Sequence, residues 1–130
     1  MNTEETKEFI PKFNDDGLIP AVAQDITSGE VLMLAWMNKD AVKETLKTGN
    51  VCYWSRSKGE LWRKGEKSGQ TQSLAELIVD CDNDTLLLKV KQNGVACHTG
   101  RKSCFFSTAK NGELVENQKV ITPPEELYGE

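Results

Sequence analysis

Residues 72–104 read QSLAELIVDCDNDTLLLKVKQNGVACHTGRKSC. The runs 72–79 and 85–90 are rich in the branched apolar residues typical of β-strands, and the acidic run 80–84 lies between them as a connection. The second run holds three consecutive leucines, so we expect it to be buried on both faces. The stretch therefore predicts two strands joined by an acidic turn.

Before this stretch, the sequence predicts a hairpin and a helix. The apolar runs 19–25 and 31–37 flank the turn-forming residues 27–30 and are typical of two paired strands. Asn38 is suited to begin a helix as its N-cap, and Gly49 is placed to end it in a left-handed conformation. A further short strand is expected at 51–54.

After this stretch, another strand is expected at 105–108. Asn111 and Gly112 then predict a hairpin turn that needs positive φ at both central residues. Together these elements indicate an α+β fold, mainly antiparallel β-sheet with at least one helix.

The 130 residues are expected to form a single domain. Residues 1–16 are acidic and predict a flexible arm, in which Phe9, Ile10 and Phe13 could pack down. Residues 123–130 predict an acidic tail. The segment 55–72 holds three glycines and shows no apolar periodicity, so we interpret it as a long functional loop.

The composition indicates a globular protein and argues against a membrane-spanning or secreted one. Apolar residues make up 38% of the chain and charged residues 28%, as in ordinary globular proteins. No apolar run could span a bilayer, and the N-terminus lacks a signal-peptide pattern, so we expect a cytoplasmic location and no membrane partner. Cysteines in that reducing compartment are better interpreted as metal ligands or reactive thiols than as disulfides.

The charge distribution favours a small anionic substrate. The net charge of −4 argues against a nucleic-acid partner. Residues 52–72, in contrast, contain five basic and two acidic side chains. A basic loop that simply faces water is the plain alternative.

Three cysteines suggest a zinc site. Cys81, Cys97 and Cys104 lack the paired Cys-x-x-Cys spacing of a structural site, and suit three ligands with an open fourth position. Zinc lowers the pKa of a bound water to about 7, which provides a nucleophile at neutral pH. Cysteines that are merely small buried side chains are the alternative. His98, next to Cys97, is predicted to act as a general acid/base, because histidine titrates near neutral pH.

Three alternating aspartates suggest a second metal. Asp80, Asp82 and Asp84 resemble the start of a calcium loop, but Thr85 and Lys91 stand where that loop needs glycine and glutamate. Magnesium is then the expected ion. An extended segment would place the three carboxylates on one face and Cys81 on the other. An acidic surface turn without a metal remains open.

The basic segment is predicted to hold the substrate. Hydroxyl, guanidinium, ammonium and backbone donors suit phosphate oxygens. They come from Ser55, Arg56, Ser57, Lys64, Ser68 and Gly69. Trp62 could stack on a base or anchor the loop. The His-x-Glu and Pro-Cys-x-x-Cys signatures of zinc nucleobase deaminases are absent.

Four blocks of the chain resemble one known family. These blocks span residues 29–38, 53–57, 61–69 and 80–106. In this order they resemble the phosphoribosyl-AMP cyclohydrolases of histidine biosynthesis. The resemblance implies hydrolytic opening of the adenine ring of phosphoribosyl-AMP between N1 and C6, with Zn²⁺ at the three cysteines and Mg²⁺ at the three aspartates. It also implies an intertwined homodimer whose zinc sites draw cysteines from both subunits.

Within the matching blocks, Trp54 and Arg101 join the predicted substrate-binding residues. Two positions depart from the family pattern. Gln70 stands where many members have histidine or asparagine, and Lys58 stands where arginine is frequent. Two other functions remain as alternatives: a non-catalytic dimer held by structural zinc, which chelation would unfold, and a deaminase of a phosphorylated purine nucleotide, which would release ammonia.

Overall fold

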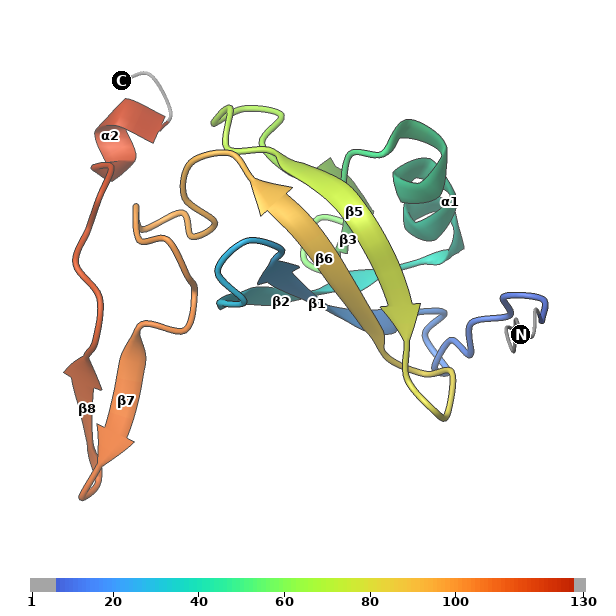
Figure 1. The fold of residues 1–130 in the computed structure, drawn as a ribbon, viewed down its shortest axis with the longest axis horizontal. Helices are drawn as coiled ribbons and strands as arrows, with labels where there is room; N and C mark the ends of the chain where they lie inside the picture. Colours follow the sequence, from blue (N-terminus) through green and yellow to red (C-terminus); the bar gives the residue numbers. More distant parts are fainter. Residues whose placement is uncertain (1–6, 128–130) are drawn as a thin grey trace, which may run out of the picture.

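The computed structural model describes residues 7–127, and its main feature is a six-stranded sheet (Figure 1). The strands lie in the order β4-β3-β2-β1-β6-β5. They are β1 (Ile19–Asp25), β2 (Val31–Met37), β3 (Cys52–Ser55), β4 (Glu60–Arg63), β5 (Gln72–Val79) and β6 (Leu86–Gln92). Only the β1–β6 pair is parallel. The expected α+β fold with a mainly antiparallel sheet is confirmed.

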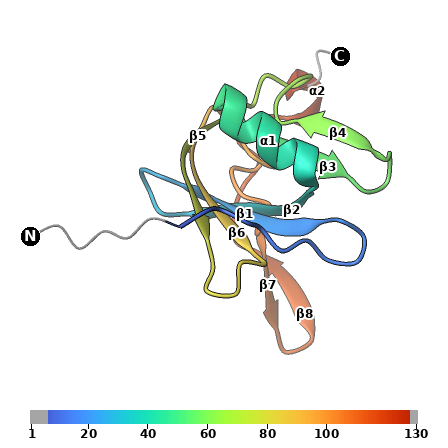
Figure 2. The ribbon, with the colours of Figure 1, turned by 90° about the vertical axis from the view of Figure 1, so that its right-hand side faces the viewer.

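Helix α1 (Lys39–Thr48) covers one side of this sheet (Figure 2). It begins where predicted, because the Asn38 side chain accepts a hydrogen bond of 2.8 Å from the N–H of Ala41. It ends at Gly49, whose φ of 77° is the left-handed conformation that glycine adopts without strain. The buried face of α1 includes Ala41 and Val42, which pack into the hydrophobic core.

Burial alternates along the central strands. Leu86, Leu88 and Val90 of β6 are fully buried, whereas Leu87 and Lys89 between them are only partly covered. Successive side chains of a strand point to opposite faces, and α1 covers one face only. The expected burial of this strand on both faces is therefore wrong for the single chain.

Two segments of the chain differ from the sequence-based expectations. The segment 55–72 is not a continuous loop, because it contains β4, which pairs with β3 in antiparallel register. The strand expected at 105–108 is β7 (Ser107–Lys110), which pairs with β8 (Glu113–Glu116) in a separate hairpin. Its turn has φ values of 49° at Asn111 and 81° at Gly112, as predicted.

The ends of the chain are partly structured. Of the three apolar residues in the predicted arm, Phe13 packs against the core, while Phe9 and Ile10 are exposed. The predicted acidic tail begins with a short helix, α2 (Pro124–Leu127). The remaining parts of both predictions, residues 1–6 and 128–130, lie outside the described residues. Neither described helix is long and apolar enough to cross a membrane.

Candidate functional site

A cavity of about 680 Å³ opens between the β3–β4 hairpin, the loop after β4 and the segment after β6. Pockets of this size commonly bind small ligands. Eight of the residues predicted to bind or act on substrate or zinc line it: Ser55, Ser57, Trp62, Lys64, Ser68, Cys97, His98 and Cys104. The fold thus gathers residues that are far apart in the sequence.

The segment after β6 is folded back on itself so that two cysteines meet. The N–H of Cys97 donates to the carbonyl of Arg101 over 3.1 Å, and the N–H of Cys104 donates to the carbonyl of Leu32 over 2.7 Å. Gly100 between them has a φ of 89°. A Cβ at this position would lie 1.8 Å from the carbonyl oxygen of Thr122, so only glycine fits.

The two thiols form a close pair. Desolvation and, to a lesser extent, the hydrogen-bonded neighbour Cys97 together raise the pKa of Cys104 to about 12. Thr99 donates its hydroxyl to the sulfur of Cys97 over 3.0 Å. Both cysteines line the cavity together with the neighbouring His98. Two of the three predicted zinc ligands and the predicted acid/base therefore share one site.

The third predicted ligand, Cys81, lies elsewhere. It is exposed and belongs to the β5–β6 connection, at the opposite end of β6 from Cys97. The seven residues of β6 span about 20 Å, which exceeds any zinc–sulfur distance many times over. The three cysteines accordingly do not meet within one chain.

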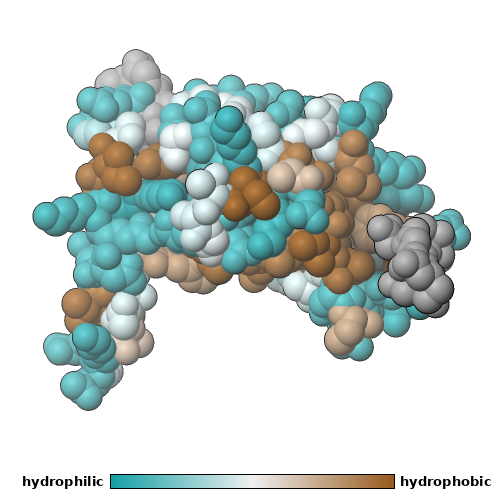
Figure 3. Space-filling view, viewed as in Figure 1, coloured by the Kyte–Doolittle hydropathy of each residue, from teal (hydrophilic) through white to brown (hydrophobic). Residues whose placement is uncertain are grey.

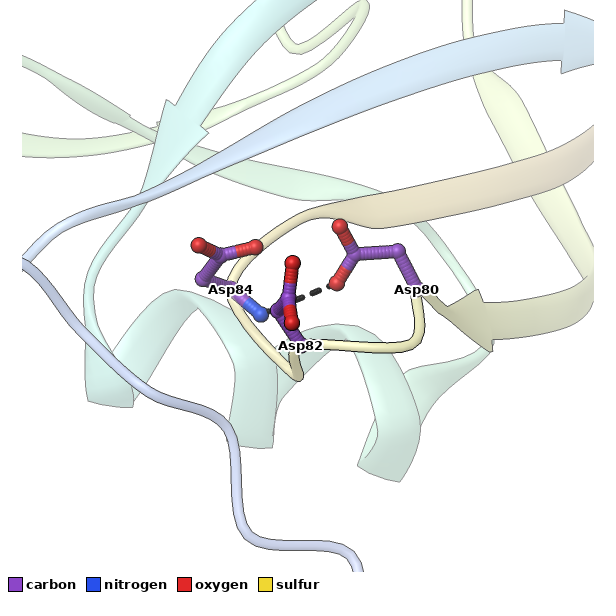
Figure 4. Close-up of side chains that lie close together, drawn as sticks. All are labelled: Asp80, Asp82 and Asp84. Atoms are coloured by element: carbon purple, nitrogen blue, oxygen red, sulfur yellow. Dashed lines mark hydrogen bonds between the residues drawn. The ribbon is translucent and has the colours of Figure 1, made fainter.

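The three aspartates do come together (Figure 4). Each offers one carboxylate oxygen, and these oxygens lie within 4.8 Å of one another. The segment is a tight turn rather than an extended strand, with Asn83 at a φ of 63°. Asp80 accepts hydrogen bonds from the N–H groups of Asp84 (3.0 Å) and Thr85 (3.3 Å). Desolvation raises the pKa of Asp80, but these hydrogen bonds outweigh it and the net shift is downward, so the carboxylate stays charged.

Lys64 lies deep in the cavity. The residue is only 8% exposed, and its Nζ donates to the carbonyl of Ala96 over 2.7 Å. The Nζ also lies 5.6 Å from the ring centre of Trp62. Burial lowers the pKa of Lys64, and the charges of Cys104 and Cys97 act in the opposite direction. The ammonium of Lys64, which was predicted to meet phosphate, is thus buried against the backbone of the cysteine segment.

Four predicted substrate-binding residues do not line this cavity: Trp54, Arg56, Gly69 and Arg101. Arg56 lies over the ring of Trp36 at 4.9 Å. Arg101 stacks on Phe106 at 4.1 Å and forms a 3.0 Å ion pair with Glu116. Both guanidinium groups thus lie over aromatic rings of the same chain, and that of Arg101 also has a carboxylate partner.

Gln70 has a role that the sequence did not reveal. Its side-chain oxygen accepts a 2.7 Å hydrogen bond from the N–H of Val95, two residues before Cys97. A second hydrogen bond joins the same two segments, because the backbone N–H of Asn93 donates to the carbonyl of Thr71 over 2.8 Å. The loop after β4 therefore holds the cysteine segment in place. The pairing of β5 with β6 brings these distant residues together.

Comparisons with known proteins identify the family of this chain. The sequence model of the phosphoribosyl-AMP cyclohydrolase family matches residues 33–106. The phosphoribosyl-AMP cyclohydrolase of Paramagnetospirillum magneticum is 62% identical over 117 residues, which cover 90% of this chain and 89% of that protein. The same enzyme of Halorhodospira halophila is 60% identical over 117 residues, covering 90% and 82%. That of Chromohalobacter salexigens is 55% identical over 129 residues, covering 98% and 88%. The chain belongs to the phosphoribosyl-AMP cyclohydrolase family.

Proposed function

We propose that this chain hydrolyses phosphoribosyl-AMP in histidine biosynthesis, opening the adenine ring between N1 and C6, and that zinc and magnesium serve as its cofactors. The observation that carries the proposal is the cavity in which Cys97, Cys104 and His98 meet, in a chain of this family. A ligand-sized cavity with paired thiols and an imidazole suits metal-assisted hydrolysis of a small substrate.

The donor set fits zinc. Cys97 and Cys104 offer two neighbouring soft ligands, and three thiolates with an open position are one form of a catalytic zinc site. When bound there, zinc would polarise a water and lower its pKa towards neutrality. We propose that Cys81 of a second copy supplies the third thiolate, since the Cys81 of the same chain lies at the far end of β6.

The outer face of the sheet supports this homodimer. One apolar row crosses four neighbouring strands of the sheet. Its members pair in register from strand to strand: Leu34 (β2) with Val22 (β1), Val22 with Leu87 (β6), and Leu87 with Ile78 (β5). Leu34 is 48% exposed and Ile78 is 39% exposed. Figure 3 shows apolar side chains gathered around the end of β5. A second copy that covers this row would bury apolar surface next to the connection that carries Cys81.

His98 is the residue proposed to move protons. Addition of water to C6 releases a proton, and cleavage of the C6–N1 bond requires one at N1. An imidazole at the cavity wall can take the first proton and return it to N1, so atoms and charge balance over the reaction.

Substrate recognition is assigned to the other wall of the cavity. Ser55, Ser57 and Ser68 offer hydroxyl groups to phosphate oxygens, and Trp62 offers a ring on which the base can stack. The three aspartates, with oxygens within 4.8 Å, offer magnesium the carboxylates it prefers and leave positions for water or phosphate. We further propose a cytoplasmic location, where the four free cysteines stay reduced.

The activity is tested by incubating purified protein with phosphoribosyl-AMP, zinc and magnesium and following the ultraviolet absorbance of the ring-opened product. We expect turnover without ammonia release. Ammonia would indicate a deaminase, and a metal-loaded protein without turnover would indicate a structural zinc dimer.

The shared zinc site is tested with hybrid dimers isolated through two different affinity tags. A hybrid of Cys81→Ser and Cys97→Ser chains would retain one complete site, so we expect about half of the wild-type activity per dimer. The matched control is a hybrid of Cys97→Ser and Cys104→Ser chains. Because these two thiols meet in one chain, each of its sites lacks a ligand, and no activity is expected. Equal activity of the two hybrids would contradict the proposal.

A further inference from the structure

The buried ammonium of Lys64 has no carboxylate partner. Among the described residues, no Asp or Glu oxygen lies within 4.0 Å of its Nζ, although three other basic side chains have such partners. Its one hydrogen bond to the protein goes to the carbonyl of Ala96. An ammonium has three donors, and burying its charge without an anion is costly. Lys64 therefore requires an anionic partner, and in the isolated chain that partner is not a carboxylate.

The nearest candidates for that anion are the two thiols. The hydrogen bond to Ala96 places the ammonium against the residue that directly precedes Cys97. Cys97 and Cys104 line the same cavity as Lys64. On another side the Nζ faces the ring of Trp62. Lys64 thus lies beside the cysteine segment and is held by the carbonyl of Ala96.

The net charge of the proposed zinc site accounts for the position of Lys64. Three thiolates around one Zn²⁺ leave a net charge of −1, and a nearby cation would balance it. Lys64 is the buried basic residue of the described chain. The exposed Lys67, which lines the same cavity, remains free to meet a phosphate.

We propose that Lys64 is a positioning residue of the zinc site: its ammonium fixes the Ala96–Cys97 backbone and neutralises the thiolates, and it is not a phosphate ligand. This inference rests on the proposed function, because it presumes that zinc binds the cysteines. It replaces the phosphate-binding role predicted for Lys64 from the sequence.

The test compares zinc affinity among variants by competition with a chromophoric chelator, at fixed pH and protein concentration. Lys64→Met keeps the length and apolar stem of the side chain but removes its charge and its donor. Loss of a group that supports metal ligands typically weakens metal binding 10- to 100-fold, and we expect a loss in that range. Lys67→Met, the matched control, should bind zinc as tightly as the wild type.

Circular dichroism and thermal unfolding verify that each variant is folded. If Lys64→Met does not fold, Lys64→Gln carries the same prediction, since it keeps a donor for the Ala96 carbonyl but removes the charge. Wild-type zinc affinity in either folded variant, with a raised KM for phosphoribosyl-AMP, would assign Lys64 to phosphate binding and overturn the inference. A wild-type protein that binds no zinc would instead overturn the proposed function itself.

Discussion

The contact between Gln70 and residues 94–95 allows a quantitative test by a double-mutant cycle. Gly94 has a φ of 79°, and a Cβ built there would lie 1.7 Å from the side-chain oxygen of Gln70. A Gly94→Ala variant therefore combines two effects: a left-handed backbone at alanine, and displacement of the Gln70 side chain from the N–H of Val95.

Each effect has a known size. A left-handed alanine costs about 1 to 2 kcal/mol. Leaving the buried N–H of Val95 without its acceptor costs about 1 to 3 kcal/mol. Gly94→Ala should then lower the free energy of unfolding by about 2 to 5 kcal/mol, and Gln70→Ala alone by about 1 to 3 kcal/mol.

The double variant separates these effects. In Gly94→Ala the hydrogen bond is already lost, so adding Gln70→Ala should change the stability little and relieve the clash. The expected coupling is about 1 to 3 kcal/mol, measured by urea unfolding at one protein concentration, because a dimer's stability depends on concentration. If Gln70→Ala destabilised the wild type and Gly94→Ala by the same amount, the two residues would not be coupled and our account of the Gln70 contact would be refuted.

Two further predictions concern stability and catalysis. The carboxylate of Asp25 accepts a 2.9 Å hydrogen bond from the N–H of Ser28, and this bond lowers the pKa of Asp25 below its usual 3.8. The contribution of the Asp25 carboxylate to stability is therefore present above pH 3.8 and is lost as the pH falls through the lowered pKa. Asp25→Asn should lower the free energy of unfolding by about 1 kcal/mol at pH 7, and this difference should shrink at lower pH. A difference that stays constant with pH in urea titrations would contradict this. His98→Gln should lower kcat by about 10²- to 10⁴-fold while metal analysis finds unchanged zinc content. Loss of zinc in this variant would show instead that His98 supports the metal.

Local signals in the sequence predicted most of the regular structure. Apolar runs between turn residues placed β1, β2 and β5 correctly. Asn38 and Gly49 marked the ends of α1, because capping depends on residues within one turn of the helix. The aspartate cluster was also predictable, since its three members lie within five residues of one another.

Features that depend on distant residues were missed. β4 has too few apolar residues to be recognised alone, and becomes a strand because Leu61 and Trp62 pair with Trp54 and Tyr53. The contact of Lys64 with Ala96 joins residues 32 positions apart, so no spacing rule predicts it. The partial exposure of Leu87 could not be foreseen either, because it depends on which face of the sheet α1 covers.

The parallel pairing of β1 with β6 bears on how the chain folds during its synthesis. β1 ends at Asp25, and its partner begins at Leu86, so the ribosome must add about 60 residues before the centre of the sheet can close. At 5–20 residues per second this takes roughly 3 to 12 s, during which one edge of β1 has no neighbouring strand. An unpaired edge can pair with other nascent chains. Chaperone binding to the emerging hairpin of β1 and β2 would protect this edge until β6 has been synthesised.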